Sequence, residues 1–232
     1  MRTLAVVPVK SFSSAKQRLS HGLASGARRS LAQAMFSDVL GALRRARALD
    51  AIAVVTEDIS AEAIARRDGV VVLHDDGRSG QSHATMIGVE YAQAEGFGRV
   101  VLVPGDAPLL DPAELDELLL RAEHDGIEVV IVPDRHGTGT NALVIAPPGT
   151  FEPSFGPGSY ERHLAAAKRN GAAYRSVELP SLSLDVDTPD DLAALWSLID
   201  GPRGRAQRTR GALAQLERSG ARATLERASV EV

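Results

Sequence analysis

Three aspartates in this 232-residue chain stand where a carboxylate could bind a ligand. Asp106 ends the apolar run "VLVPGD", and Asp185 and Asp187 lie in "LDVD", directly before a helical pattern. Carboxylates from distant segments suggest a hard divalent cation, because Mg²⁺ favours one or two carboxylates together with phosphate oxygens and water. The aspartates therefore predict a Mg²⁺ site that also receives phosphate groups.

Basic residues and glycine-bearing loops indicate where those phosphates would bind. Lys10, Lys16 and Arg18 lie in one polar segment near the N-terminus and would supply positive charge. The segments "GTGTN" and "FGPGS" are typical of anion-binding loops, since glycine lets backbone N–H groups approach an oxyanion. Ser159 begins a helical pattern, where the helix dipole favours an anion.

Each of these residues has a purely structural explanation when it is taken alone. Asp106 could be a turn residue after Pro-Gly, Asp187 could belong to a helix cap, and Lys16 could be solvated surface. The hypothesis therefore depends on the whole set. Missing motifs argue against other chemistries: the histidines lack the spacing of a zinc site, and no nucleophile elbow, dinucleotide fingerprint or P-loop occurs.

The hydrophobic pattern alternates between short β-branched runs and longer helical stripes. Six runs are typical of buried strands. The helical patterns have clear boundaries, such as Asp111 before Pro112 at a start and Gly171 at an end. The expected strands are residues 3–9, 51–56, 70–75, 99–106, 128–134 and 141–146, and the expected helices are 25–47, 60–69, 79–96, 112–122, 160–171 and 189–199.

Strands that alternate with helices predict a mostly parallel sheet that is covered on both faces. Ligands of such a sheet gather outside the carboxyl ends of the strands. Lys10 follows the first expected strand, Asp106 follows the fourth and Asp134 follows the fifth. We therefore expect one basic loop and several acidic loops to converge on one edge of the sheet.

The composition is that of one α/β domain followed by a tail. The chain is 44% hydrophobic and carries a net charge of −4, whereas residues 201–232 hold seven Arg and three Glu. We predict a domain of residues 1–200 and an Arg-rich tail of residues 201–232. The tail is expected to be solvated, poorly ordered or marginally helical, with nucleic-acid binding the less favoured interpretation.

The absence of cysteine excludes disulfides and thiolate chemistry and fits a reducing cytoplasm. No apolar run reaches the roughly 18 residues that a membrane span needs. The apolar part of the N-terminus is too short for a signal peptide. A cytoplasmic protein without a membrane partner is expected, and the oligomeric state has no signature in the sequence.

Five motifs in a fixed order resemble the guanylyltransferases of deazaflavin coenzyme (F-420) biosynthesis. They are "VPVKSFSSAKQRLS", "VPGDAPLL", "DRHGTGTNAL", "FGPGSYERH" and "LDVDTPDDL". The resemblance covers residues 3–199. It implies a single-domain, Rossmann-like nucleotidyltransferase fold of the nucleotide-diphospho-sugar transferase type, with a mostly parallel central sheet flanked by helices. "PGDxP" with "DxDTPxDL" alone would indicate only the wider sugar-nucleotide and molybdopterin-nucleotide transferase superfamily.

The resemblance implies a reaction in which GTP gives its guanylyl group to the phosphate of a three-carbon acid and pyrophosphate leaves, with Mg²⁺ as cofactor. The acid is phosphoenolpyruvate or, as the alternative, 2-phospho-L-lactate. The Arg- and Ala-rich, bacterial-looking composition favours phosphoenolpyruvate. The product would be handed to the downstream deazaflavin transferase.

The same motifs imply roles for single residues. Asp106, Asp185 and Asp187 look like the metal ligands, with Asp185 preferred because helix capping competes for Asp187. Gln81 and Ser82 stand where a Leu-Asn pair is expected beside the nucleotide. The expected catalytic residues are Lys10, Lys16, Arg18 and Asp106, the expected acceptor contacts are Thr140, Gly156 and Ser159, and the expected nucleotide contacts are Pro8, Lys16, Gly80, Gln81 and Gly105.

Two other hypotheses compete with this one. The protein could be a nucleotidyltransferase for a sugar phosphate or a molybdopterin. It could also be a GTP-binding regulatory protein without turnover, which uses the Arg-rich tail on nucleic acid.

Overall fold

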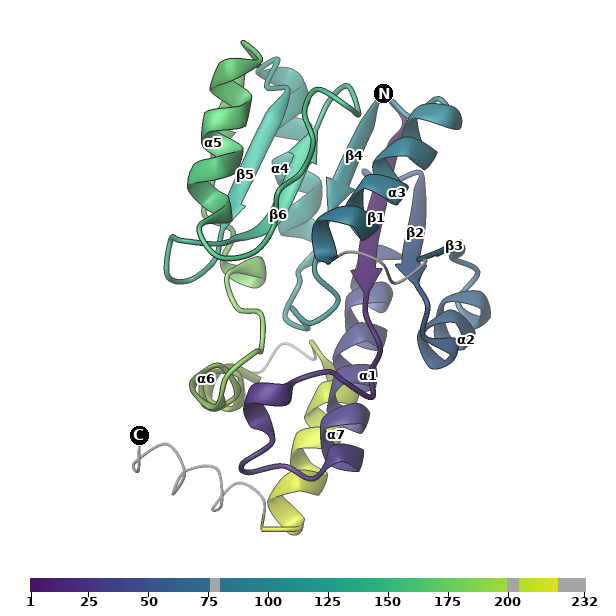
Figure 1. The fold of residues 1–232 in the computed structure, drawn as a ribbon, viewed down its shortest axis with the longest axis vertical. Coiled ribbons are helices and arrows are strands. Elements are labelled where there is room, and N and C mark those ends of the chain that lie inside the picture. The colour runs from purple at the N-terminus through teal and green to yellow at the C-terminus, as the bar shows by residue number, and fades with distance from the viewer. Residues whose placement is uncertain (76–79, 200–204, 221–232) are drawn as a thin grey trace.

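A seven-stranded sheet forms the centre of the fold in a computed structural model of the chain, which describes residues 1–75, 80–199 and 205–220. The strands lie in the order β3-β2-β1-β4-β6-β5-β7 (Figure 1). Their bounds are β1 Thr3–Val9, β2 Ala51–Thr56, β3 Val71–His74, β4 Arg99–Leu102, β5 Val129–Pro133, β6 Thr140–Ile145 and β7 Tyr174–Ser176.

One strand of the sheet runs against the others. β6 pairs antiparallel with both β4 and β5, whereas β1, β2, β3 and β4 pair in parallel and β5 pairs in parallel with β7. The expectation of a mostly parallel sheet is confirmed. Because β6 is reversed, its first residue, Thr140, lies at the edge where β1 and β4 end.

The strands are apolar because both faces of the sheet are covered by helices. Helices α1, α2 and α4 pack on one face, and α3 and α5 pack on the other. Each face has its own core, which is mainly aliphatic, as the low aromatic content leads one to expect, with two buried phenylalanines in each. The bounds are α1 Ser25–Leu43, α2 Ile59–Arg67, α3 Gln81–Ala94, α4 Pro112–His124 and α5 Ser159–Arg169.

Helix α3 crosses β1 in unusually close contact. A Cβ atom on Gly88 would lie 2.3 Å from Cγ1 of Val6, so only glycine allows this approach. The contact holds the N-terminal end of α3, which begins at Gln81, against the carboxyl edge of the sheet.

A third core lies beyond the sheet and supports its carboxyl edge. It joins the far side of α1 to α6 (Pro189–Ile199) and α7 (Gln207–Arg218), and Figure 1 shows α7 lying along α1. Leu184 and Val186, which flank the predicted metal-binding aspartate Asp185, are buried in it. Two 3₁₀ turns, η1 Gln17–Leu19 and η2 Pro180–Leu182, complete the described elements.

Helix α7 differs from the solvated extension that the composition favours. Leu213 is 2% exposed and Leu216 is 6% exposed, and Asp38 of α1 accepts hydrogen bonds from the backbone and hydroxyl of Thr209. The apolar face is narrow because only Thr209, Leu213 and Leu216 are buried, which explains why its pattern is weak in the sequence. Residues 201–204 and 221–232 of the expected tail lie outside the described residues.

Replacing Leu213 with alanine should lower the free energy of unfolding by about 2–4 kcal/mol, because it opens a cavity in the third core. Urea denaturation of the purified protein measures this change. Leu198→Ala is the matched control, since Leu198 is 57% exposed on α6. Equal and small effects of the two substitutions would show that α7 is not part of the folded domain.

Candidate active site

A cavity of about 370 Å³ opens at the carboxyl edge of the sheet, beyond the ends of β1 and β4. Its size is within the range of small-ligand sites. The residues of the sequence prediction that line it are Pro8, Lys10, Lys16, Gln81, Gly105, Asp106 and Asp187. The structure therefore brings the basic N-terminal segment, the start of α3 and two of the predicted carboxylates together.

The loop that carries Lys10 and Lys16 is fixed at its middle. Phe12 is buried and its ring lies 5.7 Å from that of Phe36 on α1. Asp58 caps α2 with one carboxylate oxygen, and its other oxygen accepts from the backbone N–H of Phe12 at 2.8 Å. A single acidic side chain thus links the end of β2 to this loop.

Lys16 occupies the centre of the charged cluster. Its ammonium group forms ion pairs with Asp106 and, at 3.0 Å, with Asp187, and its side chain is 6% exposed. Burial by itself lowers the pKa of Lys16, but the two carboxylates raise it, so that the net pKa lies above the ordinary value. Lys16 also has a φ of 58°, which is rare for a residue with a side chain and occurs often at functional sites.

Asp106 reaches the cluster through the turn that follows β4. A Cβ atom on Gly105 would lie 3.3 Å from Cγ2 of Val9, so glycine lets this turn pack closely against the end of β1. The backbone oxygen of Asp106 accepts from the N–H of Val186 at 3.3 Å. This contact fixes the "LDVD" segment beside the turn.

The "LDVD" segment alternates between the core and the cavity edge. Leu184 and Val186 are buried, so Asp185 and Asp187 project from the opposite side. Asp185 accepts a hydrogen bond from Asn141 of β6 at 3.2 Å. Burial, together with the charges of Asp106 and Asp187, raises the pKa of Asp185 to about 6.

Helix capping does not compete for the Asp187 carboxylate, so the expectation that it does, on which the preference for Asp185 as metal ligand depends, is wrong. Thr188 and Asp191 form the cap of α6. The carboxylate of Asp191 accepts from the backbone N–H of Thr188 at 2.7 Å, and the hydroxyl of Thr188 accepts from the backbone N–H of Asp191 at 3.2 Å. The carboxylate of Asp187 takes no part in this capping box, because it pairs with Lys16 and is 53% exposed.

The carboxylates of the cavity offer part of a metal-binding shell and not a complete one. Among the described residues, no three carboxylate or histidine side chains are gathered closely enough to hold a metal alone. Asp106 and Asp187 nevertheless share one cation, the Lys16 ammonium, which shows that a positive charge is accommodated between them. Mg²⁺ needs only one or two carboxylates when phosphates and water complete its shell.

The predicted acceptor residues form a second cluster beside the first. The backbone N–H of Thr140 donates to Oγ of Ser159 at 2.9 Å, and both side chains are buried. Asn141, the next residue, reaches Asp185 of the charged cluster. The two clusters are therefore neighbours along the same edge of the sheet.

Arg162 of α5 shapes the loop that precedes this helix. Its guanidinium donates to the backbone oxygens of Ser154, Phe155, Gly156 and Pro157. Because a trans peptide directs its N–H away from its C=O, the N–H groups that follow these oxygens face the other side. One of them, that of Phe155, donates to Oγ of Ser82 at the start of α3. The φ angles of 104° at Gly156 and 70° at Gly158 give the loop this shape.

Several sequence-predicted residues are not part of the cavity lining: Asp185, the acceptor residues Thr140, Gly156 and Ser159, and also Arg18, Gly80 and Asp134. Arg18 is exposed on η1, and Gly80 is exposed just before α3. Asp134 closes the turn between β5 and β6, where its carboxylate accepts from the backbone N–H groups of His136, Thr138 and Gly139. Residue 79, at which the expected helix 79–96 begins, lies outside the described residues.

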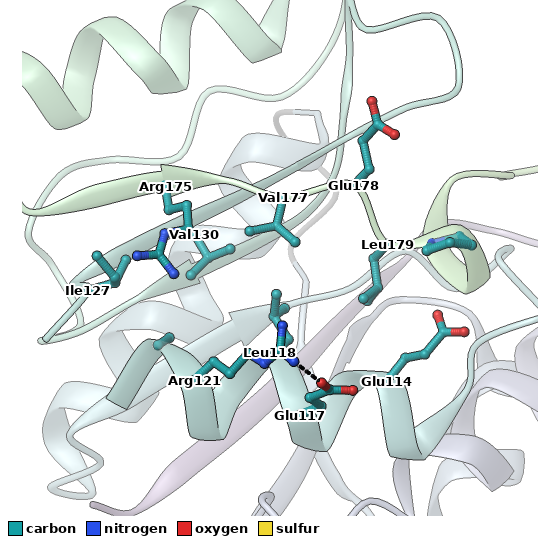
Figure 2. A pocket seen from close by; sticks show the side chains of 12 residues that line it. Glu114, Glu117, Leu118, Arg121, Ile127, Val130, Arg175, Val177, Glu178 and Leu179 are labelled. Atoms are coloured by element: carbon teal, nitrogen blue, oxygen red, sulfur yellow. Dashed lines mark ion pairs between the residues drawn. The ribbon is translucent and has the colours of Figure 1, made fainter. Parts of the chain in front are cut away.

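A second cavity, of about 440 Å³, lies between α4 and the segment that contains β7. Figure 2 shows Leu118 of α4 and Val177 of the β7 segment on opposite sides of this cavity, and the ion pair between Glu117 and Arg121. Arg175 also pairs with an acidic residue, Asp125. None of the predicted site residues lines this cavity, so the cavity at the carboxyl edge remains the candidate site.

Asp185→Asn should stabilise the metal-free protein at pH 8 by about 1–3 kcal/mol, because a shift of one pKa unit corresponds to about 1.4 kcal/mol. The folded-state pKa of Asp185 is raised, so its proton stabilises the fold below the ordinary pKa near 4, and this contribution is lost as the pH rises through about 6. Urea denaturation in EDTA at pH 4.5 and pH 8 measures it. If Asp185→Asn raised the free energy of unfolding equally at both pH values, the ionised Asp185 carboxylate would not be the cause of the destabilisation.

Comparisons with known proteins identify the family. The family described as "Guanylyl transferase CofC like" matches residues 3–216. The chain belongs to this family of guanylyltransferases. It is 50% identical over 219 residues to the phosphoenolpyruvate guanylyltransferase of Conexibacter woesei, covering 94% of this chain and 98% of that protein. It is 34% identical over 205 residues to the 2-phospho-L-lactate guanylyltransferase of Methanothermobacter thermautotrophicus, covering 88% and 89%.

Solved structures confirm the fold class of this CofC-like chain. A putative nucleotide-diphospho-sugar transferase from Desulfovibrio desulfuricans superposes with a TM-score of 0.77 at 17% identity, covering 98% of both chains. A 4-diphosphocytidyl-2C-methyl-D-erythritol synthase gives a TM-score of 0.61 at 16% identity, covering 86% of this chain and 98% of the other. The expected nucleotidyltransferase fold is thus present. Within the described residues, no helix is long and apolar enough to cross a bilayer.

Several residues of the CofC-like site were missed by the sequence analysis. Asn141 follows Thr140 directly, and its position inside "GTGTN" was a signal. His163 lies one helical turn after Ser159, on the same face of α5, so the i, i+4 spacing could have indicated it. Arg162 acts through backbone oxygens of a loop, which no side-chain pattern indicates. Ser82 was singled out in the sequence, but its contact with the backbone N–H of Phe155 was not foreseen.

Proposed function

We propose that the protein transfers the guanylyl group of GTP to the phosphate of phosphoenolpyruvate, giving enolpyruvyl-2-diphospho-5'-guanosine and pyrophosphate, a step of coenzyme F-420 biosynthesis. The observation that carries the proposal is the adjacency of two clusters in a chain of the CofC-like family. One cluster joins a lysine to two carboxylates, and the other presents two buried hydroxyls beside a glycine loop.

The reaction needs charge stabilisation and positioning more than proton transfer. An ionised phosphate oxygen of the acid forms a bond to the α-phosphorus of GTP, and the bond from that phosphorus to the bridging oxygen of the β-phosphate breaks. Pyrophosphate leaves with the bonding electrons. Because the nucleophile is already ionised, no general base is required.

The residues of the cavity have distinct roles in this proposal. Lys16 and Lys10 neutralise charge that moves onto the leaving pyrophosphate, and Arg18 contributes from the exterior of the same loop. Asp106, with Asp185 or Asp187, would hold Mg²⁺. When bound, Mg²⁺ would offset the repulsion between the two polyanionic substrates. Thr140, Ser159 and the loop at Gly156 bind the acid.

The relative from Methanothermobacter thermautotrophicus makes 2-phospho-L-lactate the second candidate acceptor. The two acids differ by two hydrogens, so a pocket discriminates between them only modestly. We expect a higher kcat/KM for phosphoenolpyruvate, because the relative with 50% identity is named for that substrate.

Steady-state kinetics with purified protein, Mg²⁺ and each acid tests this proposal, with the downstream deazaflavin transferase present to remove the product. GTP and CTP are compared with each acid. A larger kcat/KM for GTP with phosphoenolpyruvate supports the proposal. Turnover only with 2-phospho-L-lactate would change the acceptor, and no turnover with either acid, under conditions in which GTP binds, would overturn the proposal.

A further inference from the structure

The hydroxyl groups of the acceptor cluster each already accept a hydrogen bond from the protein. Oγ of Ser159 accepts from the backbone N–H of Thr140, and Oγ1 of Thr140 lies 2.9 Å from Nδ1 of His163. Across residues 1–75, 80–199 and 205–220, neither hydroxyl has a second partner. Each hydroxyl therefore keeps its own proton for a ligand.

The direction of the bond between His163 and Thr140 follows from the other ring nitrogen. The backbone N–H of Ser154 donates to Nε2 of His163 at 2.9 Å, so Nε2 carries no proton. A neutral imidazole then has its proton on Nδ1, which must donate to Thr140. The ring is fully buried, and burial together with the Arg162 guanidinium lowers its pKa to about 4, which keeps it neutral at pH 7.

We propose that His163 is a positioning residue for the acceptor acid: by donating to Oγ1 of Thr140, it makes the Thr140 hydroxyl a hydrogen-bond donor to the acid's anionic group. This inference rests on the proposed function. A phosphate or carboxylate only accepts hydrogen bonds, so a hydroxyl whose acceptor role is already filled is suited to it. The backbone N–H of Thr140 donates to Oγ of Ser159, so the Ser159 hydroxyl is likewise left to donate its proton to the acid.

The surroundings of His163 hold the ring in this orientation. The ring of Phe155 contacts it edge-on with centroids 5.0 Å apart, and the ring of Phe151 lies 6.2 Å away. If the ring flipped about its Cβ–Cγ bond, carbon atoms would replace Nδ1 and Nε2 and both hydrogen bonds would be lost, while the two aromatic contacts hold the ring plane in place. The Thr140 hydroxyl is therefore oriented as a donor before the acid binds. This lowers the entropic cost of ordering the hydroxyl when the acid binds.

Two substitutions separate the two hydrogen bonds of His163. In His163→Gln, the amide oxygen can still accept from Ser154, but no donor reaches Thr140. In His163→Asn, the amide nitrogen takes the place of Nδ1 and can donate to Thr140. We expect His163→Gln to raise KM for the acid about tenfold, as for loss of one hydrogen bond to an ionised group. KM for GTP and kcat should change little, and His163→Asn should recover most of the acid affinity.

Two controls exclude a general loss of packing. Phe151→Leu disturbs the ring environment but neither hydrogen bond, so KM for the acid should stay near that of the wild type. In a Thr140→Val background, His163→Gln should have no further effect on KM, because the hydroxyl on which it acts is absent.

The tautomer can be measured in the wild-type protein by ¹⁵N NMR of the histidine side chains. Protonation of Nδ1 in His163 supports the proposal, and protonation of Nε2 would overturn it. An unchanged KM for the acid in His163→Gln would also overturn it. If the wild-type protein transfers guanylyl to neither acid, the proposed function fails instead, and the two failures are distinguishable because the tautomer is read without substrate.

Discussion

Asp106→Asn should lower kcat by about a thousandfold, because several kcal/mol of charge stabilisation in the transition state would be lost. The fold should be unchanged. Asp106 lies in a turn after β4 and is part of the ion-paired cluster, not of the apolar core. In the proposed reaction its carboxylate holds Mg²⁺ beside the phosphates. Asparagine keeps the size of the side chain and removes only the charge. The rate of pyrophosphate release at saturating GTP and acid measures the effect.

Asp190→Asn is the matched control for this substitution. Asp190 is exposed on the first turn of α6, and its replacement removes the same unit of charge. Circular dichroism and the thermal midpoint of both variants should stay close to the wild type. If Asp106→Asn keeps its kcat at saturating Mg²⁺, Asp106 has no part in the chemistry.

Lys16→Met should lower kcat/KM for GTP by about 10²–10³, as for loss of one preorganised charge at a reacting phosphate. Methionine keeps most of the length of the side chain without its ammonium group. Lys16 is held at the cavity by Asp106 and Asp187, so its charge is preorganised before substrate binds. Lys168→Met is the control, since Lys168 lies on the last turn of α5, away from the cavity.

The Lys16→Met variant also tests whether the Lys16 ammonium group occupies the place of a divalent cation. Without the ammonium group, the charges of Asp106 and Asp187 are uncompensated, so the metal should bind more tightly in the absence of nucleotide. Electron paramagnetic resonance of free Mn²⁺ measures this affinity in both proteins. Equal Mn²⁺ affinity in the wild type and Lys16→Met would show that Lys16 and the metal do not compete.

The sheet and most of its helices could be predicted because their signals are local. The strand Thr3–Val9 has the expected bounds, since a continuous apolar run is typical of a strand buried on both faces. Asp111 and Pro112 placed the start of α4 correctly. The helix expected over 25–47 ends at Leu43, and the strand expected over 99–106 pairs only to Leu102, because pairing partners decide where elements end.

Other features depend on tertiary contacts that no local pattern records. β7 has three exposed residues and exists through its pairing with β5. The reversal of β6 is not visible in its apolar sequence. Helix α7 buries few side chains, and these pack in one cluster with residues of α1 and α6, which its own sequence pattern does not indicate.

The charged residues and the glycines of the site could be predicted from the sequence. The residues that orient them could not. Lys16, Asp106 and Asp187 come together as expected, although their ion pairing could not be inferred from separations of 90 and 171 residues. His163 lies on the buried face of α5, which has a core-like pattern in the sequence, whereas Arg162 lies on the exposed side of the same helix. Their roles follow from bonds to backbone atoms, which the sequence does not encode locally.

Label transfer from GTP tests the central claim most directly. The protein is incubated with Mg²⁺, phosphoenolpyruvate labelled with ¹⁴C, and GTP labelled with ³²P at either the α- or the γ-phosphate. We predict that the α-label enters a product that also contains ¹⁴C, and that the γ-label appears in pyrophosphate. Bound GTP without any transfer of the α-label, or release of the γ-label as inorganic phosphate alone, would contradict a guanylyltransferase.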